Sequence, residues 1–414
     1  MKDDRGAILP AKRRLRIGFV SIEDASDILS WSGIPFQILS HLRQHSVDVE
    51  VISPLDRRLK YFLTPAILLA KARKQRLVLN HSSTLLKSYA RQIERQLDKR
   101  PVDVIVSANS IPITFLRCSQ PVVFWNDAVF HNMVSYYPGF FSSLTPSAIR
   151  RGKRQEERAL QRSDAAIYSS NWAANCARSL TDPDKIYILP LGSSLTEEAT
   201  QEEIASRARM KRRKRVNSCE LLFVGVEWER KGGDIAIETA RLLNDSGIKT
   251  RLRVVGSRPR TTPPDFVELL GFIPKSTREG MTQLSDLFRS ADLFILPTKA
   301  EAAGIVFSEA SSFGLPTVTY DTGGVSDYVK DGVNGVCLPE SGTAADFAAT
   351  VRALLDPKIY EDLSVQAFQE YRKRLNWATS VEKLVGICES LVGHRSLHAR
   401  GRPYGLDAHS SQQP

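Results

Sequence analysis

Leu296-Pro-Thr-Lys-Ala-Glu-Ala-Ala-Gly-Ile-Val-Phe-Ser-Glu-Ala310 is the stretch that decides the fold of this 414-residue chain. The apolar run Leu293 to Pro297 predicts a strand that leads into it, and the pattern that follows predicts an amphipathic helix beginning at Gly304. A helix that begins just past a strand end, with glycine at its first turn, points free backbone N–H groups outward. Such a helix N-terminus suits a diphosphate.

Two acidic residues, Glu301 and Glu309, stand on either side of Gly304. A carboxylate accepts two O–H hydrogen bonds, and the neighbouring hydroxyl groups of a sugar or ribose ring supply such pairs. A ligand that is anionic at its centre and carries hydroxyl groups on both sides is a nucleotide sugar. Each glutamate alone would be interpreted as a solvated charge, so the hypothesis depends on their joint placement around the helix start.

The segment resembles the signature of retaining glycosyltransferase family 4, whose members have the GT-B fold. Further motifs continue the family's pattern in order: Leu221-Leu-Phe-Val-Gly-Val-Glu-Trp-Glu-Arg-Lys-Gly-Gly-Asp234, Gly314-Leu-Pro-Thr-Val-Thr-Tyr-Asp-Thr-Gly-Gly-Val-Ser-Asp327 and Asp331-Gly-Val-Asn-Gly335. The resemblance is strong from about residue 221 to residue 339 and weaker before it. It implies two doubly wound Rossmann-like domains that face one another across a cleft.

Strand-like and helix-like runs alternate in both halves of the chain, which by itself predicts an α/β protein with parallel sheets covered on both faces. The predicted strands span residues 16–21, 47–52, 102–107, 122–125, 165–169, 186–189, 221–225, 251–255, 293–296 and 317–320. Helices are predicted to include residues 35–44, 153–162 and 232–243. Ligands of doubly wound folds bind outside the carboxyl ends of the strands, so the cleft is the expected site.

The polar and basic residues 196–218 predict a surface linker, partly helical, between two domains. By the resemblance, residues 1–195 form an N-terminal Rossmann-like acceptor-binding domain and residues 219–376 a C-terminal donor-binding domain. An apolar helical stripe near the end implies a helix over about 377–393 that crosses back to the first domain, with Trp377 as its anchor. The alternative is an ordinary terminal helix on its own domain. Residues 394–414 are predicted to be disordered, because they are rich in Gly, Ser, Gln and charge.

Lys231 and Arg230 are the predicted cations for the departing diphosphate, since fixed positive charge aimed at the leaving oxygen gives group transfer its largest help. Lys231 follows a predicted strand and turn and opens a helix, and Arg230 could add a bidentate clamp. Family members often have an arginine directly after the glycine equivalent to Gly225, where this chain has Val226. Arg230 is then the substitute. Both cations could instead be solvated residues at a helix start.

The resemblance assigns the remaining contacts around the donor. Backbone N–H groups near Gly304, Ile305 and Val306 would bind the diphosphate. Glu309 would hold the two ribose hydroxyl groups, and Glu301 would contact hydroxyl groups of the transferred sugar. A carboxylate next to a diphosphate is repelled by it, so Glu301 is expected to face the sugar.

Two loops are weaker candidates for donor contacts. Phe272 and Ile273 follow a strand-like run and would lie near the nucleobase, although Gly and Pro mark many turns that bind nothing. Gly33, in Trp31-Ser-Gly-Ile-Pro35, resembles the glycine of the family loop that approaches the donor phosphate and the acceptor. The alternative is a simple helix N-terminus with proline near the first helical position.

Asp127 is the third catalytic candidate, with Lys231 and Glu301. It ends a predicted strand at the place where many relatives have His-Asp, and Asn126 occupies the histidine position. A histidine-dependent contact to the sugar is therefore lost or replaced, and Asp127 becomes the more interesting polar group. A carboxylate that caps a turn is the alternative interpretation.

Composition limits the partners. The net charge of +11 comes largely from residues 57–100 and 210–215, yet aromatic residues do not alternate with the basic ones and no nucleic-acid module is recognisable. Peripheral contact with an anionic membrane or an anionic acceptor fits better, and merely solvated charges fit as well. The beginning of the chain has no apolar leader, and five scattered cysteines lack metal-ligand spacing. These features predict a cytoplasmic protein, or one peripheral at the inner membrane face.

The sequence therefore predicts a retaining hexosyltransferase that uses a nucleotide sugar such as a UDP- or GDP-hexose and requires no metal or other cofactor. The expected acceptor is a glycan, a lipid-linked sugar or a polysaccharide. A catalytically idle sugar-nucleotide binding protein of the same fold is the main alternative, because of Asn126 and Val226. A phosphorylase or epimerase of the same fold, and a membrane-docking or RNA-binding scaffold, are the others.

Overall fold

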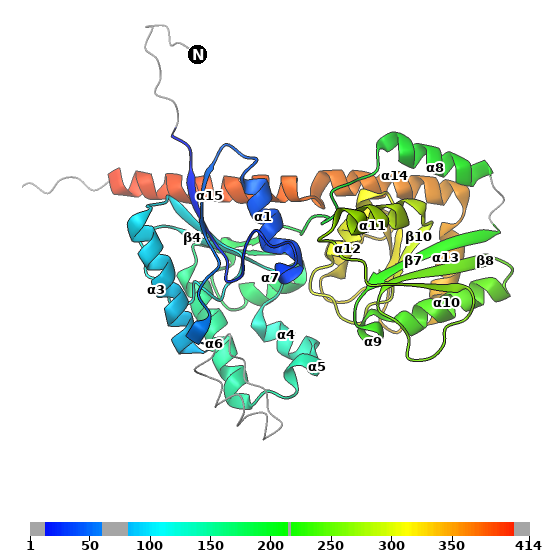
Figure 1. Cartoon of the computed structure of the whole chain (residues 1–414), viewed down its shortest axis with the longest axis horizontal. Coiled ribbons are helices and arrows are strands. Elements are labelled where there is room, and N and C mark those ends of the chain that lie inside the picture. Colours follow the sequence, from blue (N-terminus) through cyan, green and yellow to red (C-terminus); the bar gives the residue numbers. More distant parts are fainter. Residues whose placement is uncertain (1–12, 60–81, 214–216, 401–414) are drawn as a thin grey trace, which may run out of the picture.

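Two parallel six-stranded sheets form the centres of two lobes in the computed structural model, which describes residues 13–59, 82–213 and 217–400 (Figure 1). The first sheet has the order β2-β1-β3-β4-β5-β6. Its strands are β1 (Arg16–Val20), β2 (Asp48–Ile52), β3 (Val104–Ser107), β4 (Val122–Asn126), β5 (Ala165–Tyr168) and β6 (Ile186–Ile188). Every residue of β3, β4 and β5 is buried, as in a parallel sheet covered on both faces.

The second sheet has the order β12-β11-β10-β7-β8-β9. Its strands are β7 (Ser218–Gly225), β8 (Lys249–Gly256), β9 (Val267–Gly271), β10 (Leu293–Leu296), β11 (Thr317–Tyr320) and β12 (Gly335–Leu338). Strands β7 and β10 lie at its centre, so the residues that follow them emerge at the middle of the carboxyl edge. This is the crevice position where ligands of doubly wound sheets bind.

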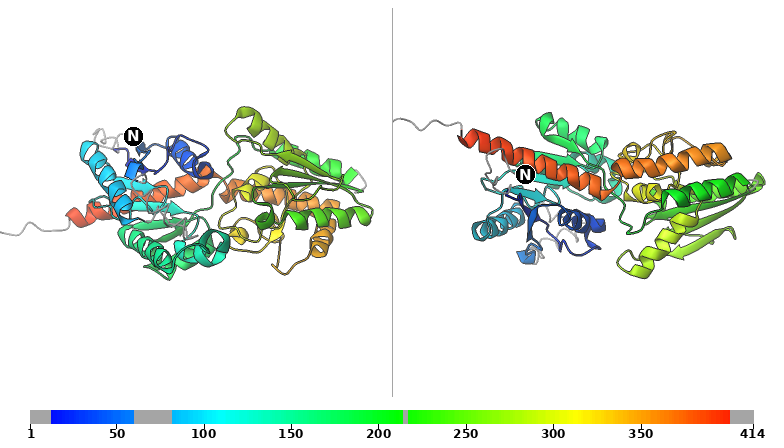
Figure 2. Two further views of the ribbon diagram at one scale, coloured as in Figure 1. Left: turned by 60° about the horizontal axis from the view of Figure 1, so that its bottom comes forward. Right: turned by 90° about the horizontal axis from the view of Figure 1, so that it is seen from above.

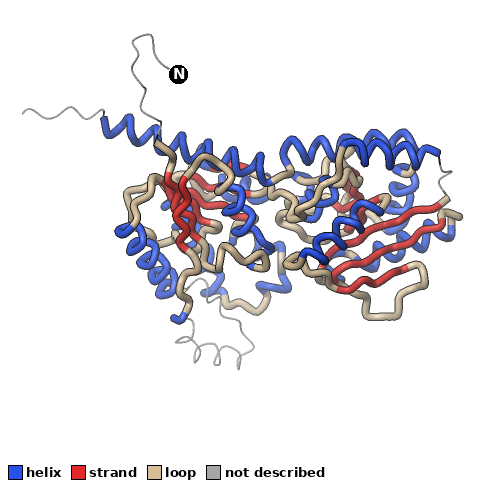
Figure 3. Tube along the Cα trace, turned by 45° about the horizontal axis from the view of Figure 1, so that its top comes forward, coloured by secondary structure: helices blue, strands red, loops and turns tan. Residues whose placement is uncertain are grey.

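Helices lie outside the strands in both lobes (Figure 3). Those of the first lobe are α1 (Ile34–Leu42), α3 (Ser83–Lys99), α4 (Phe130–Tyr136), α5 (Pro138–Phe141), α6 (Pro146–Arg162) and α7 (Asn171–Arg178), with short 3-10 turns at Ser30–Gly33 (η1) and Pro183–Lys185 (η4). Those that follow are α8 (Gln201–Arg213), α9 (Trp228–Lys231), α10 (Gly233–Asp245), α11 (Arg278–Ser290), α12 (Ile305–Ser312), α13 (Ala344–Leu354), α14 (Pro357–Arg374) and α15 (Trp377–Arg400), with η5 at Val325–Asp327. Polar residues begin several of them: Thr145, Ser170 and Thr277 each accept a hydrogen bond from the first helical turn.

The segment predicted as a linker contains α8, which packs against α14 in the second lobe. Ile204 of α8 is buried, and the guanidinium group of Arg207 donates to the carbonyl oxygens of Phe313 (2.5 Å), Gly314 (3.0 Å) and Arg289 (3.2 Å). The polar composition of the segment hides this packing, because Arg207 makes its contacts through hydrogen bonds rather than apolar surface.

Helix α15 leaves the second lobe and runs along the first, which two further views show clearly (Figure 2). It contacts α1. The ring of Trp377 lies 5.7 Å from that of Trp125 in β4, and the hydroxyl group of Ser380 donates to the carbonyl oxygen of Pro190 at 2.8 Å. An added Cβ on Gly192 would lie 2.3 Å from the backbone nitrogen of Trp377, so only glycine permits this approach.

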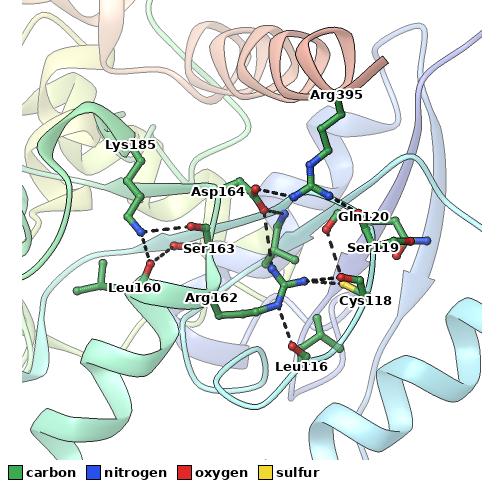
Figure 4. Close-up of polar contacts among 11 residues, drawn as sticks. Leu116, Cys118, Ser119, Gln120, Leu160, Arg162, Ser163, Asp164, Lys185 and Arg395 are labelled. Carbon is green, nitrogen blue, oxygen red and sulfur yellow. Dashed lines mark hydrogen bonds and ion pairs between the residues drawn. The ribbon is translucent and has the colours of Figure 1, made fainter. Parts of the chain in front are cut away.

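Farther along α15, Arg395 reaches down to the first lobe (Figure 4). Its guanidinium group pairs with Asp164 at 2.7 Å and donates to the carbonyl oxygen of Ser119. The same carboxylate accepts from the backbone N–H of Val122 at 2.8 Å, which links the helix to the start of β4. The last helix is thus fixed to the first lobe at two places, one near each end of its described part.

The structure corrects three expectations. Strands β9 and β12 were not predicted, because both lie at sheet edges and are only partly buried, so they lack the fully apolar run of a central strand. The helix predicted at 153–162 begins earlier, at Pro146. The tail predicted to be disordered from residue 394 is helical as far as Arg400, and residues 401–414 lie outside the described residues.

Candidate active site

A cavity of about 470 Å³ lies in the cleft at the carboxyl edge of the second sheet. Nine predicted site residues line it: Arg230, Lys231, Phe272, Ile273, Glu301, Gly304, Ile305, Val306 and Glu309. Ile28, Leu29 and Ser32 of the first lobe close its opposite wall. We call it the donor cavity.

The turn after β7 fixes Lys231. Glycines at its end permit a close fit: Gly232 has φ of 75°, and a Cβ added there would lie 2.0 Å from the carbonyl oxygen of Pro297. Trp228 is buried beneath the turn, and its indole N–H donates to Asp234 at 2.8 Å. These contacts hold Lys231 in the cleft with only 10% of its side chain exposed.

Glu301 lies in the loop after β10 and meets both predicted cations. The ammonium group of Lys231 donates to Oε2 of Glu301, and Arg230 lies 3.7 Å from the same oxygen. Arg230 also donates to the carbonyl oxygen of Ala300 at 2.6 Å and to Glu227 at 2.6 Å. Glu301 is therefore bound to the cations expected at the diphosphate, and a donor would have to share or exchange these contacts.

Helix α12 begins at Ile305, with Gly304 as its N-cap residue and no side chain capping it. The ring of Phe307 occupies the space that a Cβ on Gly304 would need, at 2.2 Å, so glycine is required here. The first N–H groups of a helix have no partner within the helix, and the first two helical residues, Ile305 and Val306, line the cavity.

Glu309 lies one turn farther along α12 and is completely buried. Its Oε1 accepts from the ammonium group of Lys275, whereas its Oε2 is buried and has no partner among the described residues. A buried carboxylate oxygen without a partner is costly. It therefore marks a position where a hydroxyl group of a ligand would be stabilised.

Two predicted residues do not line the donor cavity. Gly33 is buried and has a φ of 77°, and its neighbour Ser32 lines the cavity. Asp127 lines a second cavity of about 400 Å³ at the carboxyl edge of the first sheet, together with Asn126 and Trp31. We call this the first-lobe cavity.

The first-lobe cavity also contains a carboxylate that the sequence analysis missed. Glu156 of α6 is 4% exposed, and its two oxygens accept from Ser110 at 3.0 Å and Tyr168 at 3.4 Å. Burial raises the pKa of Glu156 to about 7, and burial raises the pKa of Asp127 to about 6, with further contributions from the negative charges nearby. Asn126 donates to Ser110 at 3.1 Å, so the residue in the histidine position belongs to this network.

Family models match both lobes. The model described as Glycosyltransferase Family 4 matches residues 36–197, and the model described as Glycosyl transferases group 1 matches residues 206–374. The chain belongs to the group 1 glycosyltransferases.

Named relatives of this glycosyltransferase are similar over part of their length. D-inositol 3-phosphate glycosyltransferase of Acidothermus cellulolyticus is 29% identical over 257 residues, which are 57% of this chain and 55% of the relative. Lipopolysaccharide glucosyltransferase WaaG of Escherichia coli is 27% identical over 267 residues, 61% of this chain and 68% of the relative. The chain thus spans about half the length of the inositol-phosphate enzymes it matches and about two thirds of WaaG.

Solved structures show the same architecture. HepE of Anabaena, in complex with UDP and glucose, superimposes with a TM-score of 0.56 at 16% identity, and the match covers 91% of this chain and 100% of that one. At this identity the likeness establishes the GT-B fold alone. It agrees with the two parallel sheets found here, which the sequence predicted.

Three residues of the candidate site were not predicted from the sequence alone. The sequence does contain a feature that could have indicated Glu156: it lies on the same helical face of α6 as the buried residues Ala148, Gly152 and Ala159, where a carboxylate is unexpected. Lys275 and Tyr136 have no such feature: Lys275 meets Glu309 across 34 positions of sequence, and Tyr136 meets Glu301 across 165. Such contacts depend on how loops and lobes are placed, which no local pattern encodes.

The described residues contain no group of three or more His, Cys, Asp or Glu side chains arranged to hold a metal ion. In the same ranges, no helix combines the length and the apolar character that crossing a bilayer requires.

Proposed function

We propose that this glycosyltransferase moves a hexose from a nucleoside diphosphate to a hydroxyl group of an acceptor, with retention of anomeric configuration and without a metal ion. The donor is a UDP- or GDP-hexose bound in the donor cavity. The acceptor, a glycan, a lipid-linked sugar or a polysaccharide, approaches from the first lobe. HepE was crystallised with UDP and glucose, and WaaG is a lipopolysaccharide glucosyltransferase. Both relatives support a nucleotide hexose as donor.

One observation carries the proposal. Glu301 and Glu309 line a single cavity on either side of the uncapped start of α12. Glu309 also has a buried oxygen available for a hydroxyl group. Two carboxylates and an uncapped helix start in one cavity support a ligand with a diphosphate at its centre, a ribose at one end and a hexose at the other.

The proposed chemistry uses the cations for the leaving group. The bond between the anomeric carbon and the diphosphate oxygen breaks, and negative charge grows on that oxygen near Lys231 and Arg230. The acceptor oxygen bonds to the anomeric carbon on the same face, and its proton passes to the departing diphosphate. Glu301 then exchanges part of its contact with Lys231 for hydroxyl groups of the hexose.

The membrane proposal rests on one face of α3. Lys87, Arg91, Arg95 and Lys99 recur every four residues and are all exposed, so they form one cationic stripe. We propose that this stripe holds the protein at the anionic inner face of a membrane, within reach of a lipid-linked acceptor. Of the basic stretch predicted for this role, residues 60–81 lie outside the described residues. Flotation with vesicles should show binding that rises with anionic lipid and falls when Arg91 and Arg95 become Gln.

The decisive experiment screens purified protein against UDP- and GDP-hexoses and measures released nucleoside diphosphate with and without chelator. We expect release with at least one donor, unchanged by EDTA, and an α-linked product from an α-linked donor. Calorimetry with UDP and GDP runs in parallel. Binding without release would instead support the catalytically idle protein, which Asn126 and Val226 suggested.

A further inference from the structure

The loop that carries Glu301 is held from the opposite lobe. Tyr136, the last residue of α4, accepts a hydrogen bond at its hydroxyl oxygen from the backbone N–H of Glu301 at 2.9 Å. On the other side of Glu301, the hydroxyl group of Ser170 donates to the carbonyl oxygen of Ala302 at 3.0 Å. Two residues of the first lobe thus bind the backbone on both sides of one acidic side chain of the second.

The hydrogen bonds at Tyr136 form a directed chain. The hydroxyl group of Thr322 lies 2.8 Å from that of Tyr136 and 3.4 Å from the carbonyl oxygen of Lys299, to which it can donate. If Thr322 donates to Lys299, it accepts from Tyr136, and Tyr136 in turn accepts from Glu301. Every polar atom then has a partner, and the chain begins and ends in the loop that carries Glu301. Hydrogen bonds in a partly buried chain of this kind strengthen one another.

The local sequence makes room for this contact. Gly323 has φ of 56°, and a Cβ there would lie 2.2 Å from the hydroxyl oxygen of Tyr136 and 2.4 Å from the carbonyl oxygen of Glu301. The ring of Tyr136 packs on Trp172 with centroids 4.6 Å apart. Nearby, Asp327 of the second lobe accepts hydrogen bonds from the backbone N–H of Asn171 at 2.6 Å and from the side-chain amide of Asn171 at 2.5 Å. These bonds join the two lobes next to the hydrogen bonds of Tyr136.

We propose that Tyr136 is a positioning residue that places Glu301 for catalysis only when the two lobes are together. Separating the lobes would remove the hydrogen bonds at Glu301 and Ala302 and release the loop from the arrangement in which Glu301 faces the cavity. Glu309, which we propose binds the ribose, and its partner Lys275 both belong to the second lobe, and the hydrogen bond between them does not involve Tyr136. This inference rests on the proposed function, because it requires Glu301 to contact the transferred hexose.

The test compares Tyr136→Phe, which keeps the ring on Trp172, with wild type. We expect kcat for nucleotide release to fall about tenfold, the cost of the hydrogen bonds lost at one hydroxyl group. The Kd of UDP or GDP, whichever the wild type binds, should change less than twofold. Tyr187→Phe is the matched control, because Tyr187 lies in β6 with 37% exposure and should keep wild-type kcat.

Variants of Thr322 test whether the hydrogen bonds of Tyr136 and Thr322 act together. Thr322→Val removes the hydroxyl group at constant volume and should lower kcat several-fold, whereas Thr322→Ser keeps the hydroxyl group and should restore it. If the residues act as one chain, Tyr136→Phe with Thr322→Val should cost little more than Tyr136→Phe alone.

The outcomes separate the two proposals. An active wild type with Tyr136→Phe of equal kcat overturns the positioning role and leaves the proposed function intact. Equal losses in kcat and in nucleotide affinity overturn it too, because they indicate general damage. A wild type that binds no nucleotide and releases none overturns the proposed function, and the positioning role with it.

Discussion

The two cavities differ in whether a cation pairs with two of their carboxylates. In the donor cavity each carboxylate has a lysine: Glu301 pairs with Lys231, and Glu309 with Lys275. In the first-lobe cavity Asp127 and Glu156 have no cation partner among the described residues, and burial raises the pKa of both. The donor cavity is thus prepared for a ligand with negative charge and hydroxyl groups. In the first-lobe cavity the charge itself depends on pH.

Replacing Lys231 tests the donor side of this comparison with the largest expected effect. Lys231→Met removes a cation that we propose stabilises the departing diphosphate, and we expect kcat to fall about 10²- to 10³-fold, as for a lost charge-stabilising group. Lys249→Met, on an exposed lysine at the start of β8, is the control. Turnover within threefold of wild type would show that the Lys231–Glu301 pair is structural.

For the first-lobe cavity, the pH dependence of protein stability tests whether Glu156 is an unpaired buried acid. Its pKa in the folded protein is about 7 against an ordinary value of 4.5, so the folded state keeps a proton that the unfolded state has lost between these values. Wild-type stability should therefore fall as pH rises from about 4.5 to about 7.

Glu156→Gln has no carboxyl group to titrate, so only wild type loses stability through this group as pH rises. Between pH 5 and pH 8 the free energy of unfolding of the variant should therefore increase relative to that of wild type by up to about 3 kcal/mol. Denaturant unfolding at both pH values measures it. An unchanged difference between wild type and variant at the two pH values would mean that Glu156 is not a buried acid that titrates near neutrality.

The comparison also shows what sequence could and could not predict. Glu301, Gly304 and Glu309 were predicted to surround one ligand, because strand, glycine and helix start follow one another locally, and all three line the donor cavity. The parallel sheets followed from the alternation of buried strands and helices. The partner of Glu309 could not be predicted, since Lys275 reaches it from the loop after β9, an edge strand that the pattern also missed.

Replacing Lys275 measures how much a cation partner contributes to stability at a buried carboxylate. Lys275→Met leaves the fully buried carboxylate of Glu309 without its cation and should lower the free energy of unfolding by about 2 kcal/mol, less than for a fully buried pair because Lys275 is partly exposed. Adding Glu309→Gln should recover most of the loss, since no charge then remains to be paired. A single variant as stable as wild type would contradict this, and thermal unfolding measures both.

Asp127 should give the smallest effect. Its pKa is about 6, so turnover should rise a few-fold as pH increases through 6, because ionisation makes the carboxyl group a stronger acceptor for the hydrogen bond from an acceptor hydroxyl group. In Asp127→Asn this step should disappear from the pH profile of kcat/KM. A step that persists in the variant would assign it to another group, with Glu156→Gln as the next variant to test.

The path of α15 has a consequence for how the protein matures on the ribosome. The helix is made after the whole second lobe, yet Trp377 and Arg395 cover β4 and the loops beside it in the first. At ordinary rates of translation, the first lobe waits many seconds with this surface open to water and to chaperones. Nascent chains stopped before residue 377 should therefore be captured by chaperones more readily than chains released after it.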